Sequence, residues 1–293
     1  LGLHSNFTES EFLDNTTLTG KTNMNIPTAS FVQVHKDLPG KWNSGAFSVI
    51  LHRANTFHQE FSYNGSGSNT SLLDSYINTI DENNITWEQL NSSDNPAYPY
   101  DIHLAWASYL VDVVEDTNSG DYYFYNAIGK DPFSQNYQET VTGAKRETAM
   151  SYGANYNDKL YVGVGLVFSR IVYNKDYSFT ERMSTTDTTT NLNDYRYSFK
   201  ESTSGLGVGA NLGIIYRPIR SLRIGASVKT PVRYSLDISY SSSMTANYVD
   251  TSFFYRSPYE GYYEYSLRSP WRSNIGASYI FGKYGLISAD IEH

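Results

Sequence analysis

The sequence predicts an all-β fold: an antiparallel transmembrane β-barrel that carries a helical extracellular loop. The first observation is alternation. Between Ser204 and Tyr240 nearly every second residue is apolar, over two stretches that join at 217–220. A period of two is typical of a strand with one apolar and one polar face. The second observation is length. The alternation holds from 222 to 240, whereas a globular strand runs ~5–6 residues and a transmembrane strand needs ~9–11.

The third observation is that short and long connections alternate along the chain. The short turns lie near Pro39, Asp158, Pro218 and Lys283. The long connections are 57–136, 178–193 and 241–262. Bacterial outer-membrane barrels show this asymmetry, with short periplasmic turns and long external loops. We therefore expect one outer-membrane barrel domain over 1–293, incomplete at both ends, with 57–136 as an extracellular helical insertion.

The composition agrees with a membrane wall and excludes several other classes. Of the 293 residues 27 are Tyr, whose side chain suits the boundary between membrane and water. There is no Cys, which excludes a disulfide scaffold and a cysteine-ligated metal site. The net charge of -8 argues against a nucleic-acid partner. No charged and apolar leader opens the chain, so we expect a piece of a longer protein.

In the N-terminal part we expect an exposed polar loop over 1–25, followed by strands over 26–36 and 45–52. In the C-terminal half the alternation predicts further strands. They are 148–156, 160–168, 204–216, 222–240, 263–281 and 287–291. A Ser- and Tyr-rich loop is expected over 241–261. This gives about eight strands in all.

The insertion is expected to begin with a flexible linker over 63–68, which is rich in Gly and Ser. Helical spacing of apolar residues then predicts helices over 71–80 and 101–116, with Asp101 as the N-cap of the second. Their apolar stripe consists of Leu73, Ile77, Ile80, Ile102, Trp106, Leu110 and Val113. It is either the core of the insertion or an exposed groove that captures hydrophobic molecules.

Several stretches resemble the FadL/TodX family of outer-membrane channels, in its Bacteroidetes-type form. They cover most of 140–293 and match in order and spacing as well as in letters. The stretches are Tyr156-Asn157-Asp158-Lys159-Leu160-Tyr161-Val162-Gly163, Leu212-Gly213-Ile214-Ile215-Tyr216-Arg217-Pro218, Lys229-Thr230-Pro231, Leu267-Arg268-Ser269-Pro270-Trp271-Arg272 and Tyr279-Ile280-Phe281-Gly282-Lys283-Tyr284-Gly285-Leu286-Ile287-Ser288-Ala289-Asp290.

The resemblance implies a fourteen-stranded barrel with an N-terminal plug inside, which takes up long-chain fatty acids and other hydrophobic compounds. This sequence shows neither the Asn-Pro-Ala motif of the plug nor the closing strands. About eight of the fourteen strands are therefore expected here. The implied partners are hydrophobic small molecules such as fatty acids, and the outer-membrane lipid and lipopolysaccharide around the wall. We expect a monomer without a cofactor.

Basic side chains gather on the face that would line the lumen. By alternation this face holds Arg223, Lys229, Arg233, Arg268, Arg272 and Asn274. The same face carries Asp237, Glu264, Asp290 and Glu292. One interpretation is a solvated ladder of cross-strand ion pairs, each worth ~0.2–1 kcal/mol. The other is a site that holds the carboxylate head of a ligand, with Lys229 and Arg233 as the best pair.

Pro231 and Pro270 fall on neighbouring strands and are expected roughly opposite each other. Proline cannot donate to a β-ladder and is confined to edges or bulges. The pair either shapes the wall as a bulge or marks a lateral opening through which an apolar ligand leaves the barrel.

No catalytic residue or metal ligand is predicted. The sequence has no nucleophile elbow, phosphate loop or zinc pattern, and His52 and His103 are expected to be polar wall and loop residues. The expected function is passive uptake of long-chain fatty acids or similar compounds across the bacterial outer membrane. The alternative is a structural or adhesin barrel without a transported ligand, and an outer-membrane hydrolase comes third.

Overall fold

The computed structural model describes residues 2–36, 38–92, 99–118, 120–128, 132–184, 191–257 and 261–293. Strands make up 72% of the chain, which confirms the all-β prediction. Twelve strands form one large antiparallel sheet of long strands. Within the described residues this sheet does not close into a barrel. No helix among them is both long and apolar enough to cross a membrane.

Three long strands form the centre of the sheet. They are β8 (Phe133–Tyr156), β9 (Leu160–Met183) and β10 (Leu192–Ile219), of 24, 24 and 28 residues. The register between them is unbroken over their whole paired length. The turn between β8 and β9 has positive φ at Asn157 and Asp158, the geometry of a tight hairpin. This short turn is therefore confirmed.

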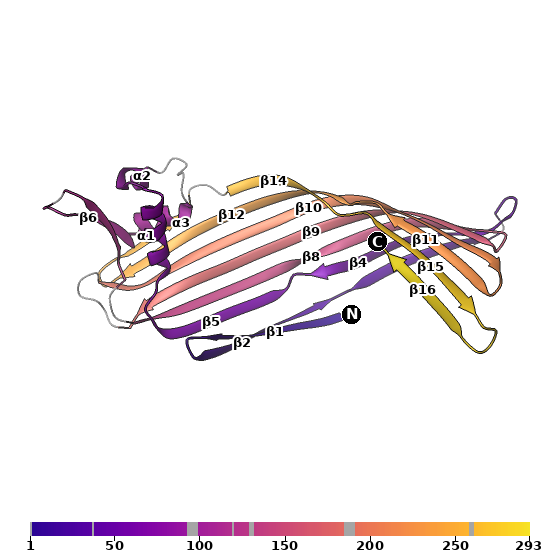
Figure 1. Cartoon of the computed structure of the whole chain (residues 1–293), viewed down its shortest axis with the longest axis horizontal. Helices are drawn as coiled ribbons and strands as arrows, with labels where there is room; N and C mark the ends of the chain where they lie inside the picture. Colours follow the sequence, from indigo (N-terminus) through magenta and orange to yellow (C-terminus); the bar gives the residue numbers. More distant parts are fainter. Residues whose placement is uncertain are drawn as a thin grey trace.

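The remaining strands of the large sheet flank these three (Figure 1). On the β8 side they are β3 (Thr28–Lys36), β4 (Trp42–Thr56) and β5 (Gln59–Ser68). On the β10 side they are β11 (Leu222–Lys229), β12 (Arg233–Tyr248), β13 (Ser252–Arg256), β14 (Gly261–Arg268), β15 (Arg272–Ile280) and β16 (Leu286–Glu292). The sheet has twelve strands rather than the eight expected, because the ribbons 222–240 and 263–281 are each divided into two strands and because β5 and β13 form where no strand was expected.

The two faces of the sheet differ in side-chain size. In β8, β9 and β10 the even-numbered residues share the face of Leu206, Val208 and Leu212, which we call the aliphatic face. The odd-numbered residues share the face of Gly205, Gly207 and Gly209, which we call the glycine face. This alternation is the one that the sequence predicts for these strands.

The insertion lies at one end of the long strands (Figure 1). It contains α1 (Leu72–Glu82), α2 (Trp87–Asn91), α3 (Tyr100–Ala107), β6 (Val111–Glu115) and β7 (Tyr122–Asn126). The first predicted helix is confirmed. The second prediction is wrong beyond Ala107, because Tyr109 takes a positive φ and the β-branched residues after it pair as β6. The N-cap of α3 is Pro99 rather than Asp101.

Three segments that were expected to be irregular are strands. Of the predicted loop 1–25, residues 2–25 form the hairpin β1 (Gly2–Phe12) and β2 (Asn15–Asn25), which lies beside β5. Residues 63–68 belong to β5, where Gly65 lies against Phe12 with no room for a Cβ. The predicted loop after Tyr240 continues β12, because Met244 and Ala246 are buried beneath the insertion. Residues 185–190 of the predicted loop 178–193 lie outside the described residues.

Between β11 and β12 the chain has one residue more than the part of β10 that it faces. Asn211 faces Lys229, whereas Val208 faces Arg233, so residues 230–232 lie opposite only 209 and 210. This is a β-bulge. Because side chains alternate, the extra residue moves odd-numbered positions from the glycine face in β11 to the aliphatic face in β12.

Candidate functional site

An exposed apolar band crosses the aliphatic face, in the half of the sheet away from the insertion. Its exposed members include Phe47, Leu51, Met150, Val164, Leu166, Phe168, Leu206, Val208, Leu212, Ile214, Ile224, Val228 and Ile275. Leu206 is 65% exposed. Toward the insertion the same face becomes polar with Asn174, Asp176 and Ser178 of β9. A contiguous patch of this extent is unusual on a free protein surface and indicates a binding surface or a membrane.

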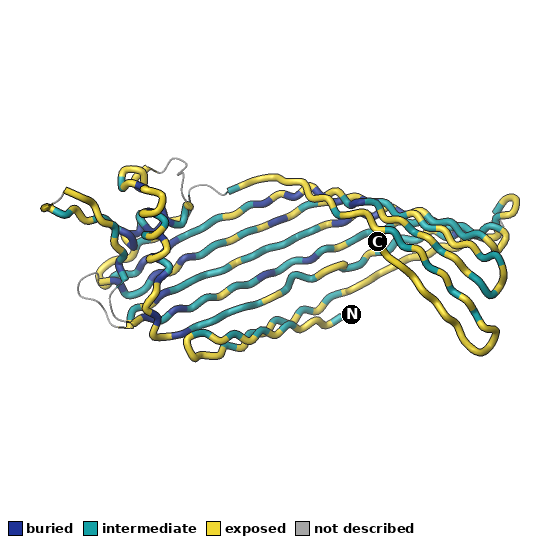
Figure 2. The backbone as a smooth tube through the Cα atoms, in the orientation of Figure 1, coloured by how far each residue is buried: buried dark blue, intermediate teal, exposed yellow. Residues whose placement is uncertain are grey.

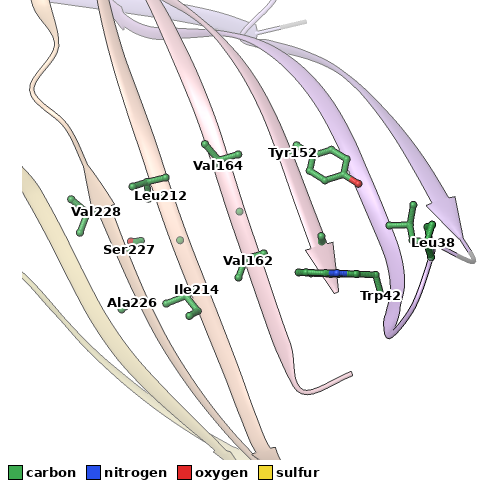
Figure 3. A pocket seen from close by; sticks show the side chains of 14 residues that line it. Leu38, Trp42, Tyr152, Val162, Val164, Leu212, Ile214, Ala226, Ser227 and Val228 are labelled. Carbon is green, nitrogen blue, oxygen red and sulfur yellow. The ribbon is translucent and has the colours of Figure 1, made fainter. Parts of the chain in front are cut away.

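The band contains a hollow of about 800 Å³ (Figure 3). Val162, Val164, Leu212 and Ile214 lie along its floor, and Trp42 and Val228 flank it on opposite sides. At the turn end of the band the Trp42 and Tyr156 rings meet at 5.1 Å between their centroids. The hollow therefore offers an apolar surface edged by aromatic rings.

A second hollow, of about 590 Å³, lies at the same end of the sheet and includes residues of the glycine face. Arg223, Ser227, Asn274 and Asp290 line it. The Asn274 amide donates to Asp290 Oδ2 at 3.3 Å. These side chains bring a cation, a carboxylate and neutral polar groups together in a space that can hold a small polar head group.

The register places four of the six predicted lumen residues on the glycine face. They are Arg223, Lys229, Arg272 and Asn274. Lys229 lies opposite Arg272, whose guanidinium is 3.8 Å from Glu292. That contact is solvated, as the ion-pair interpretation expects. Lys229 is a cation on this face, as the interpretation of a site for a ligand's carboxylate head requires.

The placement of Arg233 and Arg268 was predicted wrongly. They face each other across β12 and β14, and Arg233 also faces Val208, so both lie on the aliphatic face. Asp237 and Glu264 lie on the aliphatic face with them. Tyr234, Leu236 and Ile238 occupy the glycine face instead and are buried. The bulge at 230–232 is the cause, since it shifts the alternation by one residue.

A polar row crosses the middle of the glycine face. His52 Nε2 and Lys145 Nζ lie 3.3 Å and 2.9 Å from the carboxylate of Glu147. Lys145 also lies 5.6 Å from the centre of the Tyr234 ring, and the Tyr234 hydroxyl lies 3.3 Å from Ser169 Oγ. Only His52 was singled out from the sequence. The others meet across β8, β9 and β12, which only the strand register reveals.

Tyr234 reaches this row because it leans over Gly207. A Cβ at position 207 would lie 2.5 Å from the Tyr234 ring. The glycine run of β10, which superficially resembles a nucleotide-binding loop, is therefore a shallow strip that accommodates an aromatic ring. It lies within β10 and is not followed by the helix that a nucleotide-binding loop requires.

Toward the insertion, the glycine face contains a fully buried carboxylate, Glu181. Its oxygens accept hydrogen bonds from Gln135 Nε2 at 2.6 Å, Tyr195 OH at 2.6 Å, Ser71 Oγ and the Leu72 backbone N–H. Burial raises the pKa of Glu181, and the donated hydrogen bonds oppose that rise. Because Ser71 is the N-cap of α1, Glu181 fastens the insertion to the sheet.

Most of the predicted capture stripe is interior. Leu73, Ile80, Ile102 and Leu110 are almost fully buried in one cluster with Tyr195 and Met244 of the sheet, and Ile77 and Trp106 pack against it half-buried. Val113 lies on β6 rather than on a helix. These residues do not form an exposed groove, so the alternative of a core for the insertion is the one that the structure supports. Figure 2 shows buried residues at this end as well as along the middle of the long strands.

The register places Pro231 opposite Pro270, as predicted. The ladders β11–β15 and β12–β14 share one register, and residues 230–232 and 269–271 separate them. Across this gap Ser269 N donates to Val232 O at 3.0 Å and Val232 N donates to Ser269 Oγ at 2.9 Å. The strand assignment is therefore interrupted on both ribbons at the same level.

Comparison with protein-family models, with curated proteins and with solved structures found no match to this chain. The site must therefore be interpreted from its own chemistry. Among the described residues, His and acidic side chains do not gather in a group of three that could hold a metal ion. What the sheet offers is one exposed apolar face and one face that carries cations, small residues and buried polar groups.

Proposed function

We propose that this sheet is part of the wall of a bacterial outer-membrane β-barrel that lets hydrophobic molecules with an anionic head, such as long-chain fatty acids, cross the membrane. The exposed apolar band is the observation that carries the proposal. On β9 its outward residues run from Leu160 to Phe168 before Arg170. At ~3.3 Å per residue and a tilt of ~40°, residues 160–170 span roughly 25 Å, the height of the apolar band of such barrels.

The glycine face would line the interior of this barrel. Its cations Arg223 and Lys229 are placed to attract a carboxylate, which Lys and Arg bind through charge-assisted hydrogen bonds. Contact with each apolar surface would remove part of the ligand's apolar tail from water, which is favourable by ~25 cal/mol per Å² of buried area. The interrupted ladders at Pro231 and Pro270 support a lateral exit, because broken pairing weakens the wall there.

The bulge supplies a matched pair of variants for the test. Lys229 and Arg233 lie on one ribbon but on opposite faces. We expect Lys229→Ala to weaken oleate binding to the detergent-solubilised chain by roughly tenfold, the loss of one charge-assisted hydrogen bond of ~1.5–3 kcal/mol. Arg233→Ala should bind oleate like the wild type. Equal affinities in all three proteins would remove the proposed role of Lys229.

One observation favours a second candidate, a barrel without a transported ligand. Most of the expected capture stripe is buried in the insertion, so those described residues do not form the collecting groove that was expected. A wild-type chain that inserts into lipid bilayers but binds no oleate would support this structural or adhesin function.

A further inference from the structure

Three arginines form a row on the aliphatic face. The register places Arg53 of β4 opposite Arg146 of β8, and Arg146 opposite Arg170 of β9. The three side chains therefore project from neighbouring strands on one face. At ~4.8 Å between strands, the whole row spans roughly 10 Å. Like charges directly opposite each other are destabilising in a sheet, so this arrangement calls for an explanation.

The charge of this row is not neutralised within the described residues. None of the three arginines forms an ion pair there, and the one hydrogen bond of the Arg53 guanidinium among these residues is donated to Asn23 Oδ1, at 3.4 Å. Their neighbours along the same face are Leu51, Ala144, Thr148, Phe168, Val172 and Leu206. The adjacent carboxylate, Glu147, lies on the opposite face and is paired with Lys145 and His52.

The row also lines one groove. This groove has a volume of about 610 Å³ and is lined by all three arginines together with Leu51, Phe168, Leu206 and Val208. His52 and Glu147 also line it, but their side chains belong to the glycine face, where they pair with each other. Leu206 faces Arg170, and Val208 faces Phe168, one pleat further from the insertion. The groove thus combines a cationic end with an apolar floor, which suits an amphiphile with an anionic head.

The row marks the limit of the apolar band. Beyond it, toward the insertion, the aliphatic face becomes polar from Asn174 onward. An arginine near the middle of a bilayer costs ~2–4 kcal/mol, but one at the interface costs only ~0–1 kcal/mol. The insertion lies at the end of the long strands toward which this face becomes polar (Figure 1), and long loops are external in outer-membrane barrels. In the proposed barrel this places the row at the level of the outer-leaflet head groups.

We propose that Arg53, Arg146 and Arg170 bind the phosphate group of a phosphorylated outer-leaflet glycolipid, whose acyl chain lies along Phe168, Val208 and Leu206. The inference rests on the proposed function, since it needs the aliphatic face to be in the membrane. Guanidinium groups bind phosphate in a bidentate manner, and three in a row match the charge and width of such a head group. The bound lipid would relieve the repulsion between the arginines.

The test uses the full chain inserted into phosphatidylcholine nanodiscs, titrated with lipid A that carries its phosphates and, separately, with dephosphorylated lipid A. We expect the wild type to prefer the phosphorylated form by tenfold or more. The variant Arg146→Ala/Arg170→Ala should lose this preference and keep its affinity for the dephosphorylated form. Arg196→Ala/Lys200→Ala removes the same charge from the same face nearer the insertion and should retain the preference.

Three results would overturn the proposal. The first is an unchanged preference in Arg146→Ala/Arg170→Ala. The second is an equal loss in the control variant, which would indicate only a general attraction between basic protein and acidic lipid. The third is displacement of lipid A by millimolar inorganic phosphate, which would indicate a site for the free ion. Insertion into the nanodiscs is measured first, so its failure would count against the membrane wall rather than against this site.

Discussion

The two ends of β8, β9 and β10 are built in opposite ways. In the half away from the insertion the aliphatic face is exposed and apolar, and the glycine face carries small residues such as Gly163 and Gly165. In the half beneath the insertion the aliphatic face is polar, and the glycine face carries rings such as Tyr195 and Tyr197 in a buried core. The same strands, in one unbroken register, thus have an exposed apolar face in one half and a buried core in the other.

This difference shows which interactions hold each half together. Beneath the insertion the sheet is stabilised by burial against its own chain and by the hydrogen bonds to Glu181. Away from the insertion the apolar side chains are covered only in part by the protein itself; Phe168 is 43% exposed and Leu206 is 65% exposed. In the proposed membrane wall, lipid would cover the exposed part of these side chains. The contrast can therefore be tested by substitutions in each half.

The largest effect is expected at Glu181. Replacing it with Ala removes the acceptor of the Tyr195 hydroxyl, the Gln135 amide, the Ser71 hydroxyl and the Leu72 N–H. Each buried group that loses its partner costs ~1–3 kcal/mol, so we expect a loss of roughly 3–5 kcal/mol. Hydrogen exchange should show α1 opening before the sheet. Asp176→Ala, on the exposed face of the same strand, should change stability by less than ~0.5 kcal/mol. Equal losses of stability at both positions would contradict the stabilising role of Glu181 in the half beneath the insertion.

A charge in the apolar band should have the next largest effect. We expect Leu166→Arg to reduce the free energy of unfolding in phospholipid vesicles by ~2–4 kcal/mol, the cost of an arginine at the middle of a bilayer. Ser178→Arg places the same charge on the same face beneath the insertion and should be nearly neutral. Denaturant titration of both variants measures the difference. If Leu166→Arg were as stable as the wild type, the band would not be in lipid.

A smaller effect is expected from glycines of β10. Gly207→Ala would force the Tyr234 ring to move, because the new Cβ would lie 2.5 Å from it. Such overpacking costs ~1–3 kcal/mol. At Gly213 the nearest atom would be 3.9 Å away, so Gly213→Ala should change stability little. Tyrosine fluorescence during denaturation would report both. A harmless Gly207→Ala would show that Tyr234 does not need the space over that glycine.

The sequence predicted the long strands well because their alternation is uninterrupted and their apolar residues share one face. It failed where a strand is polar on both faces, as in the hairpin of residues 2–25, whose side chains leave no hydrophobic pattern. It also failed beyond Ala107, where apolar residues suit either a helix or a strand. In that short segment the β-branched Val111, Val113 and Val114 were the available signal.

The candidate site was predicted in part. Arg223, Lys229, Arg272 and Asn274 lie on the expected face because no irregularity separates them from the strands that define it. Arg233 and Arg268 do not, because alternation cannot be counted across a bulge. Pro231 was the available warning, since a proline inside a strand indicates a break in the ladder. The arginine row could not be found from the sequence, because its members are neighbours only through the register of β4, β8 and β9.

The single added residue at 230–232 also has a consequence for changes in chain length. Removing one residue there would exchange the sides on which Tyr234, Leu236 and Ile238 and their polar neighbours emerge, along the whole of β12. Removing two would preserve the sides and shorten the wall. Insertions and deletions in this ribbon should therefore be tolerated according to whether their number is odd or even, rather than according to their size.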